Sequence, residues 1–65
     1  MTQEETDYLD AMETLRNVAT EIRDEAHGMH LDALSVPAHH PDRARLTRAA
    51  EQLERWAREI EGVLP

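Results

Sequence analysis

Cysteine is absent from this 65-residue chain, which excludes a disulfide framework and any metal site built on thiolates. Phenylalanine and lysine are absent too, and one tryptophan and one tyrosine are the only aromatic residues. A chain of this length buries only about 60% of the surface of its unfolded state, enough for one small core. We therefore expect residues 1–65 to form a single domain stabilised by long helices, a metal bound by histidine and carboxylate, or a second chain.

No apolar run in the sequence is long enough to span a bilayer, and the first ten residues are acidic, whereas a signal peptide begins with basic residues. We therefore expect a cytoplasmic protein that has no membrane partner. The net charge is −7, and residues 1–34 contain nine acidic residues but only two arginines. Binding of nucleic acid requires a basic surface, so nucleic acid is not an expected partner.

Apolar residues recur alternately four and three positions apart in the first half of the chain. They are Tyr8, Met12, Leu15, Ala19, Ile22, Ala26, Met29 and Ala33. This spacing is typical of one side of a helix, and Thr2 with Glu5 forms a helix-capping sequence. The pattern predicts a helix over residues 3–33. Gly28 either ends this helix or costs it about 1 kcal/mol relative to alanine, and we favour a continuous helix because Met29 and Ala33 keep the spacing.

The second half of the chain repeats the pattern. Its apolar positions are Leu46, Ala50, Leu53, Ala57, Ile60 and Leu64, with Ala49, Trp56 and Val63 beside them. Pro41 suits the first position of a helix and Gly62 suits its C-terminal stop, which predicts a second helix over residues 41–61. Because a proline disfavours helical geometry at the residue before it, Pro37 and Pro41 predict a turn between the two helices.

Two helices joined by a short turn predict an all-α antiparallel helical hairpin. Alanines alternate with large residues along each apolar stripe, which allows the helix axes to approach closely. The stripes are wider than one neighbouring helix can cover, so we expect two hairpins to form a homodimeric four-helix bundle. The residues expected at the dimer or partner interface are Tyr8, Met12, Leu15, Ile22, Met29, Leu31, Leu34, Val36, Leu46, Leu53, Trp56 and Ile60.

Charge and length predict how the hairpins are arranged. Acidic residues gather at the open end of the hairpin and Arg43, Arg45 and Arg48 at the turn end, which favours an antiparallel dimer in which these ends meet.

The predicted helices differ in length, since the first is about 48 Å long and the second about 32 Å. We expect the surplus length to leave apolar surface near the turn uncovered. That surface consists of Met29, Leu31, Leu34 and Val36.

In length, hairpin form and alternation of small and large apolar residues, the chain resembles the Rop family of plasmid RNA-binding dimers. The resemblance implies a dimeric helical bundle. It is architectural, because no motif of that family can be matched residue by residue. RNA binding of that type uses a basic helix face, and the first helix of this chain is acidic, so the resemblance does not imply RNA binding here.

All four histidines lie in or beside the predicted turn. They are His27, His30, His39 and His40. His27 and His30 are one helical turn apart and could share a metal ion with Asp24 or a histidine of the turn. Protonation of all four would change the formal charge from −7 to −3. We favour solvated histidines at a turn, and no cofactor, over a metal-binding bundle or a pH sensor.

The tripeptide His40-Pro41-Asp42 is similar to the loop signature of J-domain co-chaperones, but it is also an ordinary helix start, which we favour. The few hydroxyl residues have no glycine-rich setting, and two helices enclose little space for catalysis. The sequence therefore predicts a small acidic, non-enzymatic protein that binds another protein as a dimer. An inhibitor, an antitoxin-like neutraliser or an assembly adaptor fits this description, and a metal-binding bundle that uses histidine and carboxylate is the alternative.

Overall fold

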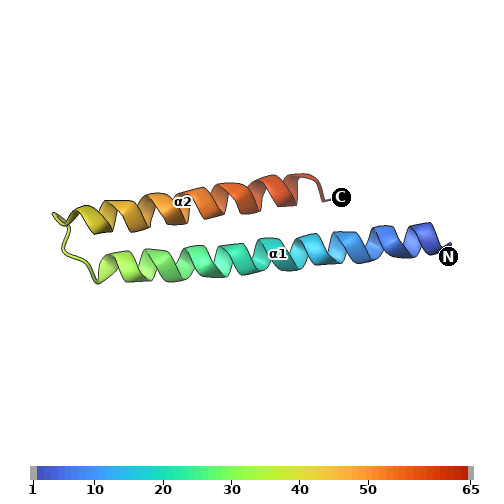
Figure 1. Ribbon diagram of the computed structural model, residues 1–65, viewed down its shortest axis with the longest axis horizontal. Coiled ribbons are helices and arrows are strands. Elements are labelled where there is room, and N and C mark those ends of the chain that lie inside the picture. Colours follow the sequence, from blue (N-terminus) through green and yellow to red (C-terminus); the bar gives the residue numbers. More distant parts are fainter. Residues whose placement is uncertain (1, 65) are drawn as a thin grey trace.

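The computed structural model describes residues 2–64 as two α-helices packed antiparallel (Figure 1). Helix α1 spans Gln3–Leu34 and helix α2 spans Pro41–Gly62. Residues 35–40 form the turn, and no strand occurs between residues 2 and 64. The predicted all-α hairpin is confirmed, and each helix ends within one residue of its predicted limit.

Local hydrogen bonds define the start of each helix. The Thr2 hydroxyl accepts a hydrogen bond from the Glu5 backbone N–H at 3.2 Å, as the capping sequence predicts. At the second helix, His40 Nδ1 accepts a hydrogen bond from the Asp42 backbone N–H at 3.1 Å, with Pro41 in the first turn. The His40-Pro41-Asp42 tripeptide is therefore a helix cap in this fold.

The two glycines adopt ordinary helical geometry, since neither has a positive φ. Helix α1 continues through Gly28, so the favoured interpretation of that residue is confirmed. Helix α2 does end at Gly62, but without the left-handed conformation that makes glycine a good stop. Val63, with φ −94° and ψ −4°, closes the helix instead by donating its N–H to the Ile60 carbonyl at 3.2 Å.

Helix α1 has 32 residues and α2 has 22, a difference of about 15 Å in length. The turn keeps the end of α1 close to the start of α2. The N-terminal part of α1 therefore projects beyond the C-terminal end of α2 (Figure 1). We refer to residues 3–14 as the N-terminal arm. The sequence predicts surplus length near the turn, and the structure places it at the opposite end. Near the turn, Met29 and Val36 are half-buried, whereas Leu31 and Leu34 are exposed.

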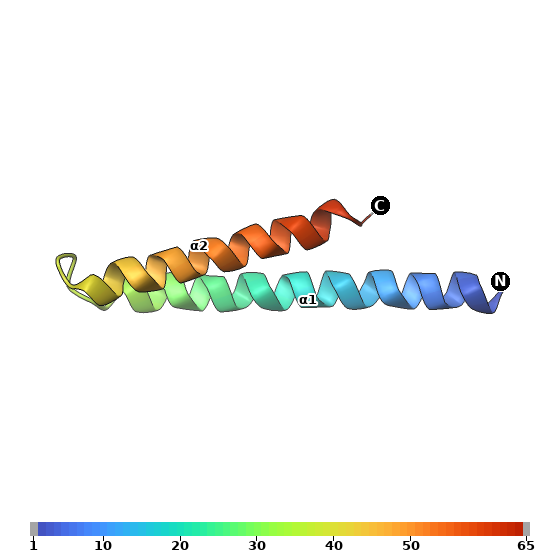
Figure 2. The ribbon, with the colours of Figure 1, turned by 45° about the horizontal axis from the view of Figure 1, so that its top comes forward.

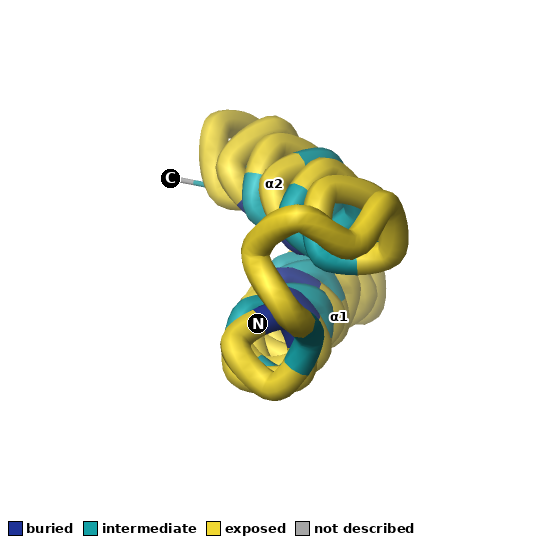
Figure 3. Tube along the Cα trace, turned by 90° about the vertical axis from the view of Figure 1, so that its left-hand side faces the viewer, coloured by how far each residue is buried: buried dark blue, intermediate teal, exposed yellow. Residues whose placement is uncertain are grey.

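Alanine makes up the whole buried core of the described residues. The buried residues are Ala19, Ala26, Ala33, Ala50 and Ala57, each 0–3% exposed. They lie where the two helices face each other (Figure 3), and the helix axes cross at a shallow angle (Figure 2). Methyl side chains at heptad spacing let the backbones approach closely. No large side chain within residues 2–64 is fully buried by this contact.

Candidate interaction surface

Most of the large apolar residues spaced by three or four positions from the buried alanines lie on the same side of the hairpin. On α1, Met29 follows Ala26 by three positions, and on α2, Leu53 follows Ala50 by three. An equal offset turns both side chains by the same angle away from the alanines at the helix contact. Because the helices are antiparallel, the two side chains then lie on the same side of the molecule. We call this side the apolar face. It consists of Leu15, Ile22, Met29, Leu46, Leu53, Trp56, Ile60 and Val63.

A shallow groove shows that side chains of the two helices meet on the apolar face. It is lined by Ile22 from α1, by Trp56, Glu59 and Ile60 from α2, and by Val63, the residue that caps α2. Trp56 is 49% exposed and Val63 is 67% exposed, and the other members of the apolar face are half-buried. The large side chains of the apolar face therefore remain partly open to solvent.

The opposite side of the hairpin is polar and carries two contacts between the helices. Arg23 forms an ion pair with Glu61, with Nε donating to the carboxylate at 2.7 Å. His30 Nε2 lies 2.7 Å from Glu54 Oε1. Seven residues separate the two partners on each helix, so the antiparallel register is regular between them. We call this side the polar face.

The His30–Glu54 contact changes the acidity of the carboxyl group. The hydrogen bond from His30 lowers the pKa of Glu54 below its ordinary value of 4.5. Burial works in the opposite direction, and the nearby charges of His30, Arg58 and Arg23 lower the pKa further. Both side chains are 39% exposed, so water screens the interaction and its contribution to stability is modest.

The sequence did not single out Glu54 as a partner of His30. A signal was present, because His30 follows Ala26 by four positions and Glu54 follows Ala50 by four. Equal offsets from facing alanines place the two residues on one side of the hairpin, which pairs them across the interface.

The structure does not bring the four histidines together as a metal site. His30 contacts Glu54, and His40 caps α2 with its ring 3.7 Å from the Asp42 carboxylate. His27 and His39 are exposed. Within residues 2–64, no group of three or more histidine, cysteine, aspartate or glutamate side chains is placed to hold a metal ion. The predicted set of His27, His30, His39 and His40 is therefore divided among separate environments.

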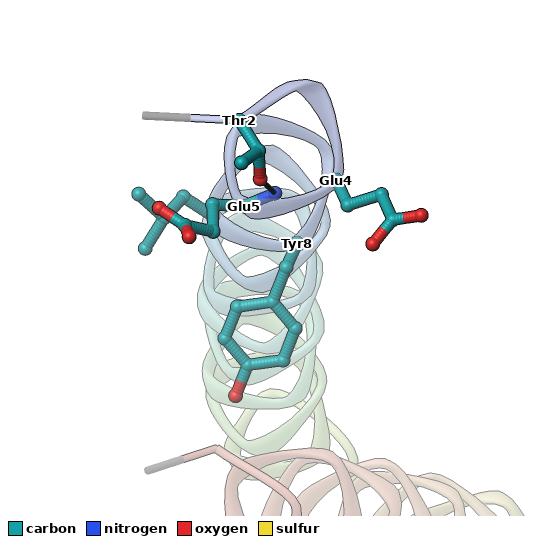
Figure 4. Close-up of a pocket in the computed structure, with 5 residues that line it drawn as sticks. Thr2, Glu4, Glu5 and Tyr8 are labelled. Carbon is teal, nitrogen blue, oxygen red and sulfur yellow. Dashed lines mark hydrogen bonds between the residues drawn. The ribbon is translucent and has the colours of Figure 1, made fainter.

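The N-terminal arm has its own open surface, lined by Thr2, Glu4, Glu5, Tyr8 and Leu9. Figure 4 shows Glu4 and Glu5 projecting to opposite sides of the helix and Tyr8 lying along it. Tyr8 is 54% exposed and Leu9 is 51% exposed. This surface has no neighbour from α2, because α2 ends before it reaches the arm (Figure 1).

The structure divides the twelve predicted interface residues into three groups. Seven lie on the apolar face: Leu15, Ile22, Met29, Leu46, Leu53, Trp56 and Ile60. Tyr8 and Met12 lie in the N-terminal arm. Leu31 and Leu34 lie on other sides of α1 and are 52% and 68% exposed, and Val36 lies in the turn. The structure adds Val63, which the heptad spacing places beside Trp56.

No protein-family model matches the chain, and no curated protein or solved structure shows significant similarity to it. Neither described helix is long and apolar enough to cross a membrane. The surfaces of the hairpin are therefore the basis for a functional proposal.

Proposed function

We propose that this protein is a homodimeric helical bundle that acts, without catalysis, by binding another protein. The observation that carries the proposal is the composition of the core. Five alanines are the only buried residues described, while the large side chains of the apolar face stay partly exposed. Exposed apolar surface shared by two helices in this way is typical of a protein–protein interface.

The exposed area and the radius of gyration of the hairpin support its association with a second chain. The chain exposes 4979 Å², whereas a compact monomer of 7.5 kDa typically exposes about 4,250 Å². The excess of about 700 Å² is close to the roughly 800 Å² that each partner buries in a standard interface. The Cα radius of gyration is 16.1 Å, against about 11 Å for a compact domain of this length. A second hairpin on the apolar face accounts for the excess surface.

The dimer leaves the outward side of α1 free for a further partner. Residues 1–34 carry nine acidic residues and two arginines, whereas residues 35–65 carry five of each. The net charge of −7 therefore resides entirely in the first half of the chain. An acidic surface steers association with a basic one, so the proposed partner is a protein with a basic surface. Inhibition, neutralisation or scaffolding of such a protein are the proposed roles.

Sedimentation equilibrium at micromolar concentration tests the dimer. Trp56→Ala is the test variant and Leu31→Ala the matched control, since these side chains are 49% and 52% exposed but only Trp56 lies on the apolar face. Burial of the exposed half of Trp56, about 100 Å², contributes about 2.5 kcal/mol per chain. With two copies per dimer, Trp56→Ala should raise the dimer Kd about a thousandfold or more.

Leu31→Ala should leave the dimer Kd nearly unchanged. A stable, cooperatively folded monomer of 7.5 kDa, or an equal loss of affinity in both variants, would contradict the dimer.

The basic partner has a separate test, in which the immobilised protein captures binding proteins from an extract of the native host. The test compares the proteins retained by the wild type with those retained by a variant that carries Glu13→Gln, Glu21→Gln and Asp24→Asn. Retained proteins should be basic and should be lost with the neutralised variant, and their retention by that variant would refute the acidic binding surface.

A further inference from the structure

We infer that the second copy docks antiparallel, with each N-terminal arm seated against the turn end of its partner's α1. This inference rests on the proposed dimer and specifies its geometry. Two orientations bring the apolar faces of two hairpins together. In the antiparallel orientation, a two-fold axis perpendicular to the helices places α1 against the partner's α1. In the parallel orientation, a two-fold axis parallel to the helices places α1 against the partner's α2.

The apolar stripe of α1 is centred on the helix. Tyr8, Leu15, Ile22 and Met29 are spaced by seven residues, with five helical residues before Tyr8 and five after Met29. When two copies of α1 overlap fully in opposite directions, Tyr8 lies level with the partner's Met29 and Leu15 lies level with the partner's Ile22. The whole stripe is then covered by its own copy, which is the self-complementary contact that a two-fold axis requires.

The parallel orientation leaves the arm without a partner. In that orientation α1 faces a helix of 22 residues, which ends short of the arm just as it does within one hairpin (Figure 1). Tyr8, already 54% exposed in the hairpin, would remain exposed. The length difference of the two helices therefore favours the antiparallel dimer, in which the only surface long enough to cover α1 is another α1.

Charge favours the same orientation. The arm contains five acidic residues, Glu4, Glu5, Asp7, Asp10 and Glu13, and no basic residue. A parallel dimer would place two such arms, each with charge −5, at one end of the bundle. An antiparallel dimer places each arm near residues 24–48 of the partner, where four acidic residues and three arginines give −1. Like charges held side by side oppose association.

Spin labels on single cysteines measure the orientation directly, and the absence of native cysteine makes the labelling specific. Glu4→Cys and Asn17→Cys place labels on exposed residues near one end and near the middle of α1. In the antiparallel dimer, the two Glu4→Cys labels should be about 44 Å apart along the bundle, and the two Asn17→Cys labels should be separated only by the width of the bundle, about 25 Å or less.

The labelled dimers distinguish the possible failures. A distance of about 25 Å or less at both positions would overturn the antiparallel inference and leave the dimer intact. A mass of one chain in sedimentation equilibrium, with no dipolar coupling between labels, would overturn the dimer and the orientation together. A long distance at Glu4→Cys with a short distance at Asn17→Cys supports both.

A second pair of variants tests whether the arm is part of the interface. Tyr8→Ala and Leu9→Ala remove neighbouring side chains that are 54% and 51% exposed, and only Tyr8 continues the apolar stripe. Tyr8→Ala should raise the dimer Kd at least about a hundredfold, and Leu9→Ala by less than about threefold. Equal effects of the two variants on the dimer Kd would overturn the seating of the arm.

Discussion

Replacing Gly28 with alanine should stabilise the hairpin by about 1 kcal/mol per chain. Gly28 lies inside α1 with helical geometry, so alanine requires no change of backbone conformation. A Cβ atom built at this position meets no other atom within 4 Å. The gain is the propensity difference between glycine and alanine in a helix interior, which arises largely because glycine is less restricted in the unfolded chain.

Urea unfolding followed by circular dichroism at 222 nm measures this gain, with wild type and variant at equal protein concentration. The same change should raise the melting temperature by roughly 4–8 °C. Gly62→Ala is the matched control, because that glycine is also in open space but ends its helix, where frayed residues gain less from propensity, about 0.5 kcal/mol or less. A loss of stability in Gly28→Ala would refute the continuous helix or reveal a chain packed against Gly28.

Two further predictions concern the polar face and the histidines. Because the folded pKa of Glu54 lies below its ordinary value of 4.5, its contribution to stability is complete above that pH and is lost as pH falls through the lowered pKa. The difference in unfolding free energy between wild type and Glu54→Gln should therefore shrink as the pH falls below 4.5, with Glu51→Gln as an exposed control. A difference that stays constant with pH would contradict the His30 contact. Within residues 2–64, no three histidine, cysteine, aspartate or glutamate side chains are placed to hold a metal ion. Treatment with a chelator and addition of one equivalent of zinc should therefore each shift the melting temperature by less than about 1 °C. Stabilisation by several degrees with zinc would support the metal-binding alternative.

The extent of each helix was readable from sequence because its determinants are local. The cap at Thr2, the proline at position 41 and the heptad spacing all act within a few residues. The prediction of α1 over residues 3–33 and α2 over residues 41–61 accordingly differs by one residue at each C-terminal end from the observed Leu34 and Gly62.

Contacts between distant residues were less accessible. His30 and Glu54 are 24 residues apart, and neither residue type by itself indicates a partner across the hairpin. The four histidines are close in sequence, which made a metal site the alternative prediction to solvated histidines, but they occupy the helix side, the turn and a helix cap. Proximity along the chain does not bring side chains together when they point in different directions around a helix.

The sequence by itself determined that two helices form and which positions on each are apolar, because helix hydrogen bonds and side-chain periodicity depend on near neighbours. Only the tertiary structure decided that the alanines occupy the contact and that the large residues are left on one open face. It also placed the surplus length of α1 at its N-terminal end. These features depend on how the turn aligns the two helices and on the close approach that methyl side chains permit, which together decide the surface left for a second chain.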